Sequence, residues 1–143
     1  MIFLSQVFSE GIPGDFSIIA VIRSTEAYAR VPVFSMYNQD SEENLVVFVG
    51  SEIAVVYQDA NGAVLDDNLI NFEADTNDLK WHRIGISFKG DSITVIFDCT
   101  QQITKKLPRS TNPKLALDGL IFMGVQLDEE EEYFIVKKTL RYL

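Results

Sequence analysis

Residues 78–99, DLKWHRIGISFKGDSITVIFDC, carry the two strand patterns that decide the fold. Apolar and polar residues alternate from position 81 to 88 and again from 92 to 99. Lys89-Gly90-Asp91 between them is a short turn sequence, so the two patterns predict an antiparallel β-hairpin. We expect Trp81, at the start of the first strand, to be largely buried in the core.

Similar short apolar runs lie on both sides of this hairpin and are separated by turn residues. They occupy residues 2–8, 16–22, 33–37, 45–49, 53–57, 69–72, 119–125 and 133–137. Turn signals about 8–12 residues apart are typical of a β-sandwich or β-barrel. Residues 41–43 and 114–117 indicate at most one helical turn each, because no segment has the apolar stripe of a longer helix. The pattern predicts an all-β fold in one domain, residues 1–143.

The composition argues against several classes of partner. The 143 residues include 12 Lys and Arg against 21 Asp and Glu, which gives a formal net charge of −9. Binding to nucleic acids or acidic membranes depends on many basic contacts, so we expect neither as a partner. No apolar stretch approaches the ~18 residues of a membrane-spanning helix. Residues 1–8 lack the basic start and the cleavage site of a signal peptide.

His82 and Cys99 are the only residues of their kinds, and neither has the neighbours in sequence that catalysis requires. His82 falls on the inward face of its strand, which is typical of a hydrogen-bonded structural histidine. Cys99 continues the inward alternation of Val95 and Phe97, which predicts a buried, reduced and poorly reactive thiol. The sequence contains no nucleophile elbow, phosphate-binding glycine loop or zinc ligand set. We therefore predict that the protein is not an enzyme.

Acidic residues gather at positions 66–67, 75–78 and 128–132. Neighbouring carboxylates on loops can bind calcium, which prefers six to eight oxygen ligands. None of these groups has the fixed spacing of a calcium loop, so we interpret them as solvated edges. No metal site and no cofactor is predicted from a specific motif, and calcium binding stays open.

The densest basic cluster contains Lys105, Lys106, Arg109 and Lys114. These four residues predict a local site for a glycosaminoglycan within an acidic protein. The alternative is that they are strand-edge basic residues that block aggregation. Three or four contacts to a polyanion release few counterions, so we expect weak affinity that falls steeply with salt.

The hairpin at residues 78–99, with its Trp-His-Arg step and its terminal Asp-Cys, resembles the central hairpin of laminin G-like domains. The resemblance is strongest to the thrombospondin N-terminal-like subclass that stands at the N-termini of collagens. It continues in order over residues 15–23, 33–37, 107–110, 118–124 and 127–130. It implies a jelly-roll, concanavalin-like sandwich of two curved antiparallel sheets. It also implies a secreted, non-catalytic protein of the extracellular matrix that binds matrix proteins or glycosaminoglycans.

The chain departs from the family pattern in three places. Cys99 has no partner cysteine, the strand after the Asp-Glu-Glu segment is shortened or missing, and no Gly-X-Y tract is present. We expect an interaction or assembly module with weak glycosaminoglycan binding, and the alternative is a calcium-dependent, lectin-like carbohydrate-binding sandwich. An enzyme such as a glycoside hydrolase is least favoured, because Trp81 corresponds to a structural position of the family and no second tryptophan offers a sugar platform.

Overall fold

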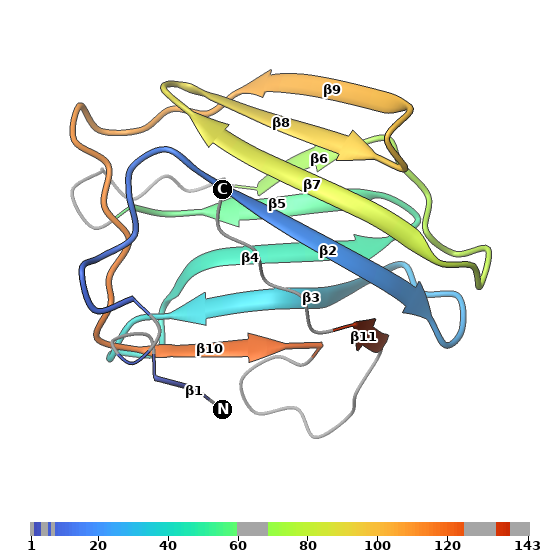
Figure 1. Cartoon of the computed structure of the whole chain (residues 1–143), viewed down its shortest axis with the longest axis horizontal. Coiled ribbons are helices and arrows are strands. Elements are labelled where there is room, and N and C mark those ends of the chain that lie inside the picture. Colours follow the sequence, from blue (N-terminus) through green and yellow to red (C-terminus); the bar gives the residue numbers. More distant parts are fainter. Residues whose placement is uncertain (1, 4–5, 7, 60–68, 125–133, 138–143) are drawn as a thin grey trace.

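The structure is a computed structural model that describes residues 2–3, 6, 8–59, 69–124 and 134–137, with the backbone alone for 2–3 and 134–137. Within these residues two antiparallel sheets lie face to face (Figure 1). The strands are β1 (Ile2–Phe3), β2 (Phe16–Ser24), β3 (Arg30–Tyr37), β4 (Glu43–Gly50), β5 (Ile53–Tyr57), β6 (Leu69–Phe72), β7 (His82–Lys89), β8 (Ser92–Phe97), β9 (Gln101–Lys106), β10 (Leu120–Met123) and β11 (Phe134–Lys137).

The two sheets differ in size and in strand order. The larger has the order β1-β10-β3-β4-β5-β6, and the smaller has the order β11-β2-β7-β8-β9. Every pairing is antiparallel, and strands distant in sequence, such as β2 and β7, lie side by side (Figure 1). This architecture confirms the predicted all-β jelly-roll sandwich. The described residues contain no helix with the length and apolar character needed to cross a membrane.

The predicted hairpin is β7 and β8, and its alternation sets one face of the core. Lys89 pairs with Ser92 at the turn, and the register continues to Ile84 opposite Phe97. The side chains of β7 are buried at every even position, from His82 to Phe88. Trp81 has the opposite parity and is 42% exposed, so the prediction that it is buried in the core is wrong.

The larger sheet is buried on both of its faces in its central strands. All five residues of β5 are buried, and β3 is buried from Val31 to Tyr37. Strands that are covered on both sides read as continuous apolar runs rather than as alternating patterns. The sequence of β5, Ile-Ala-Val-Val-Tyr, has this character.

Three local predictions differ from the structure. Residues 114–117 do not form a helical turn, and Ser41 lies in a bend with a φ of 63° rather than in a helical cap. Strand β9 was not predicted, because its sequence Gln-Gln-Ile-Thr-Lys-Lys is mostly polar. An edge strand is defined by its hydrogen bonds to its neighbour, here β8, and it does not need an apolar face.

Candidate functional site

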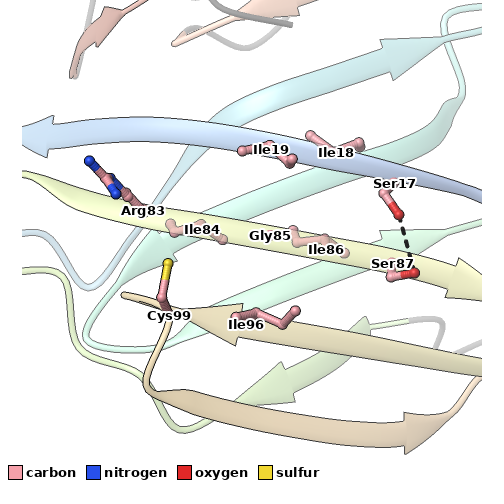
Figure 2. A pocket seen from close by; sticks show the side chains of 10 residues that line it. All are labelled: Ser17, Ile18, Ile19, Arg83, Ile84, Gly85, Ile86, Ser87, Ile96 and Cys99. Atoms are coloured by element: carbon pink, nitrogen blue, oxygen red, sulfur yellow. Dashed lines mark hydrogen bonds between the residues drawn. The ribbon is translucent and has the colours of Figure 1, made fainter. Parts of the chain in front are cut away.

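A shallow groove crosses the outer face of the smaller sheet, on the side away from the core (Figure 2). The strand registers place Ile19 of β2 opposite Gly85 of β7, and Gly85 opposite Ile96 of β8. The two isoleucines form the walls and the glycine forms the floor of this open groove, which has a volume of about 370 Å³. Both isoleucines are 38% exposed, so this part of the sheet presents apolar side chains to solvent.

The groove exists because Gly85 lacks a side chain. A Cβ atom at this position would lie 3.7 Å from the Cβ of Ile96, which is ordinary van der Waals contact. Neither a steric clash nor a positive φ therefore requires glycine here. A glycine inside a strand weakens the sheet and often marks a place where a ligand approaches closely.

The two ends of the groove have different chemistry. Arg83 and Cys99 lie at one end, and Ser17 and Ser87 lie at the other (Figure 2). The two serine hydroxyls are hydrogen-bonded to each other, with 3.2 Å between the Oγ atoms. The hydrogen bonds described for Arg83 involve its backbone, which leaves the guanidinium group available to a ligand.

Trp81 is two residues before Arg83, which lies at the basic end of the groove. The guanidinium carbon of Arg23 lies 5.4 Å from the centre of its ring, a cation–π distance. Three of the four large apolar side chains that are exposed in the described part of the chain belong to this face: Ile19, Trp81 and Ile96. Exposed aromatic and arginine side chains in one patch are typical of binding surfaces.

The smaller sheet is also distinguished by charge. None of the 21 acidic residues of the chain falls within its five strands. Half of the 12 basic residues do: Arg23, Arg83, Lys89, Lys105, Lys106 and Lys137. A protein with a net charge of −9 therefore contains one sheet that is entirely free of carboxylate side chains.

A buried histidine supports the groove from the core side of β7. His82 is 6% exposed, and its Nδ1 and Nε2 atoms each lie 2.7 Å from a carboxylate oxygen, of Asp98 and Asp78 respectively. Burial alone would lower the pKa of His82, but the hydrogen bonds to the two carboxylates outweigh it and raise the pKa. The second oxygen of Asp98 accepts the N–H of Arg83, which fixes the backbone at the basic end. The prediction of a hydrogen-bonded structural histidine is confirmed.

The structure does not bring the four residues of the predicted glycosaminoglycan site together on one surface. Lys105 and Lys106 are neighbours on β9 and therefore point to opposite faces of the sheet. Lys105 reaches the other sheet, where its Nζ donates to the carbonyl oxygen of Asn71 at 2.6 Å. Lys106 is exposed on the outer face, and Lys114 is exposed in the loop that precedes β10.

Arg109, the fourth predicted residue, has a structural role. Its side chain is only 2% exposed and donates to the carbonyl oxygens of Gly14 and Gly90 and to a carboxylate oxygen of Asp15 at 3.0 Å. Hydrogen bonds from the Gly90 N–H and from Arg109 lower the pKa of Asp15. Arg109 thus joins three loops through hydrogen bonds, and its guanidinium group is already paired within the protein.

Cys99 is exposed, which overturns the prediction of a buried thiol. The strand ends at Phe97, and both Asp98 and Cys99 have positive φ, of 51° and 60°. This left-handed turn interrupts the alternation and directs Cys99 to the rim of the groove. Among the described residues it is a free thiol.

The acidic groups were interpreted as solvated edges, and part of them can be placed. Asp75 and Asp78 are exposed, while residues 66–67 and 128–132 lie outside the described residues. Within the described ranges, no three His, Cys, Asp or Glu side chains are placed to hold a metal ion together. Sequence reasoning missed the groove, although one signal was present: a glycine at the centre of a strand, between two apolar neighbours.

Comparisons with known proteins identify solved structures with a similar fold. No family model matches the chain. Among solved structures, it is similar to the LG4-5 domains of the mouse laminin α1 chain, with a TM-score of 0.62, 11% identity, and coverage of 92% of this chain and 39% of that one. It is also similar to the LG1-3 region of the laminin α2 chain, with a TM-score of 0.62, 13% identity, and coverage of 91% and 28%.

A third similar structure is that of botulinum neurotoxin type C, whose cell entry depends on interaction with two ganglioside molecules. Its TM-score is 0.59 and its identity 12%, over 92% of this chain and 34% of that one. The chain thus spans 28–39% of the length of these solved structures. The likeness establishes that the chain has the laminin G-like, concanavalin-like β-sandwich fold.

Proposed function

We propose that this chain is a non-catalytic interaction or assembly module of a secreted, extracellular-matrix protein. The laminin G-like fold is typical of binding modules, and this supports the proposal at the level of the fold. The closer resemblance to the N-terminal domains of collagens and thrombospondins rests on the sequence alone. The observation that carries the proposal is the smaller sheet, which has exposed apolar and basic side chains and no acidic residue.

The ligand that we propose is a glycosaminoglycan, held weakly at the outer face of this sheet. Lys89 and Lys106 both pair with Ser92, so the three residues form one row across the sheet at the end opposite Arg83. At physiological salt the Debye length is ~8 Å, so acidic residues farther away than that repel a polyanion only partly. Asp91, in the same turn, and Asp15, which accepts the N–H of Gly90, lie close to this row and weaken its attraction for a polyanion. Few basic contacts are available, and the affinity should therefore be low and salt-dependent.

This proposal changes how much each residue predicted from the sequence is expected to contribute to glycosaminoglycan binding. Of the four predicted residues, Lys106 becomes the central contact, and Lys105 and Lys114 are secondary ones. Arg109 contributes through the stability of the loops, because its guanidinium group already binds two carbonyl oxygens and Asp15.

The test is chromatography on a heparin column at low and at physiological salt. The protein should be retained at low salt only, and the double variant Lys89→Gln/Lys106→Gln should elute earlier than the wild type. The matched control Lys105→Gln/Lys114→Gln removes the same charge from other surfaces and should have a smaller effect. A protein that is never retained would overturn the glycosaminoglycan proposal and leave protein–protein assembly as the function.

A second experiment, on other immobilised glycans, tests the calcium-dependent, lectin-like alternative. Retention on a panel of immobilised glycans that appears with calcium and disappears with a chelator would favour the lectin-like function. Retention of the protein on heparin that does not change with calcium would instead support binding by the basic row on the outer face.

A further inference from the structure

We propose that the groove between Ile19 and Ile96 binds a single-chain amphiphile, with the apolar chain over Gly85 and the anionic head paired with Arg83. This inference goes beyond the proposed function, because it assigns a different class of ligand to a different part of the sheet. The polysaccharide row lies at Lys89 and Lys106, which do not line the groove.

The chemistry of the walls selects an apolar chain. Ile19 and Ile96 face each other across a missing side chain, and each leaves 38% of its surface in water. A volume of about 370 Å³ falls within the ~300–1,000 Å³ range of small-molecule sites. Covering the two side chains would remove apolar surface from water, at roughly 25 cal/mol per Å².

The shape limits the length of the ligand. The hydroxyl groups of Ser17 and Ser87 bond to each other at one end (Figure 2). In the same row across the sheet, Thr94 pairs with Ser87, and its hydroxyl is joined to that of Thr104 by a hydrogen bond of 2.8 Å. This polar band marks the end of the apolar floor, so a short chain fits better than an extended polymer.

The opposite end selects an anion. Arg83 lies at the rim, and Arg23 stands over Trp81 on the same face. Asp98 is the carboxylate that is hydrogen-bonded to the backbone of Arg83. One of its oxygens accepts a hydrogen bond from His82, and the other accepts one from the N–H of Arg83. An arginine without a described side-chain acceptor binds a carboxylate or sulfate through charge-assisted hydrogen bonds.

Both parts of the ligand are needed for useful affinity. A small anion alone would bind weakly, because it would contact only one or two arginines in a protein whose net charge is −9. A neutral hydrocarbon alone would gain only the contact with two isoleucine side chains. The juxtaposition of the apolar floor with Arg83 therefore defines an amphiphile with one anionic head.

The test is a calorimetric titration of the protein with decanoate below its micelle concentration. Acetate provides the head without the chain, and 1-decanol provides the chain without the charge. Decanoate should bind at one site per chain, acetate should give no saturable binding, and 1-decanol should bind at least about tenfold more weakly. The fluorescence of Trp81, the only tryptophan, provides a second reading from the same face.

Two variants locate the site. Gly85→Leu fills the floor and should abolish decanoate binding, and Arg83→Gln should weaken it about tenfold. Lys106→Gln removes a charge from the same sheet outside the groove and should leave decanoate binding unchanged. Circular dichroism and urea unfolding show whether Gly85→Leu folds, and if it does not, Ile96→Gln tests the wall instead.

The opposite results are equally clear. Decanoate binding that survives both Arg83→Gln and the filling of the groove, or that shows several sites per chain, would overturn the proposal. Binding to vesicles of phosphatidylcholine and phosphatidylglycerol without binding to decanoate would also contradict it. Retention on heparin should persist in Gly85→Leu, so the two ligand proposals can fail independently.

Discussion

The two sheets of this sandwich use their outer faces differently. In the larger sheet, β5 is buried at all five positions, so both faces of that strand are shielded from solvent. In the smaller sheet, β7 alternates between buried and accessible residues along its whole length. In the described part of the chain, the core covers only one face of β7, and its other face is accessible to a ligand.

The two sheets also differ in their basic residues: the strands of the smaller sheet contain six and those of the larger sheet contain one, Arg30, whereas acidic residues are rare in both, with Glu43 alone in the larger sheet. The five strands of the smaller sheet contain no acidic residue, although the chain has 21 of them. A polar outer face would be sufficient for solubility, and acidic side chains would suit the composition of the chain. The six basic residues of this sheet, together with a groove floored by Gly85, indicate a face that is shaped for binding.

The largest expected effect separates the two faces of β7. Phe88 is 1% exposed and stacks on Phe16, with 4.5 Å between the ring centres. We expect Phe88→Ala to lower the free energy of unfolding by about 3–5 kcal/mol. Trp81→Ala, on the outer side, should cost about 1 kcal/mol, to which the contact with Arg23 contributes. Urea unfolding measures both, and equal losses would break the distinction between the faces.

The next effect distinguishes a basic residue with a structural role from one that is free. Arg109→Gln removes the hydrogen bonds to Asp15 and to the carbonyl groups of Gly14, which is half-buried, and Gly90, which is exposed, and it places a shorter side chain in the buried position of Arg109. The loss in the free energy of unfolding should be about 2–3 kcal/mol. Lys106→Gln is the matched control and should change stability by less than about 0.5 kcal/mol. A stable Arg109→Gln variant that loses heparin binding would restore Arg109 to the binding site.

A third pair compares one residue from each sheet. Val56 of β5 is 8% exposed, whereas Ile19 of β2 is 38% exposed. Val56→Ala should lower the free energy of unfolding by about 1–2 kcal/mol, and Ile19→Ala should cost less than about 1 kcal/mol. If Ile19→Ala proves the more destabilising of the two, the outer face of the smaller sheet is part of the folding core and the comparison fails.

The smallest effect is the pH dependence that arises from His82. Its pKa is raised from 6.5, so the stability it contributes is complete below that value and is lost as the pH rises through the folded pKa. The pKa values of Asp78 and Asp98 are lowered from 3.8, so their contribution is lost as the pH falls through the folded values. Urea midpoints should therefore be highest between about pH 4 and about pH 6.5. His82→Gln should remove the decline on the alkaline side, and a wild type without that decline would contradict this interpretation.

The sequence predicts the strands well because each buried strand carries its own apolar pattern. It fails for β9, whose polar residues become a strand only through pairing with β8. It fails for Cys99, because the left-handed turn at Asp98 ends the alternation that would have buried the thiol. Such turns depend on backbone geometry that the Asp-Cys sequence does not predict.

The binding site was harder to predict than the fold. Lys105, Lys106, Arg109 and Lys114 are close in sequence, but the strand and the loop direct them to different surroundings. Conversely, Ile19, Gly85 and Ile96 are distant in sequence and meet only through the register of three strands. Pairing across a sheet is a property of the tertiary fold, so a local cluster in the sequence is a poor guide to it.

The most direct test of the outer face is a titration of the ¹⁵N-labelled protein with decanoate, followed by NMR. We predict chemical-shift changes at the amides of Ile19, Gly85 and Ile96 and at the indole N–H of Trp81, with little change at Val47 and Val55 in the larger sheet. Changes that concentrate on β3, β4 and β5, with the groove amides unmoved, would contradict the account.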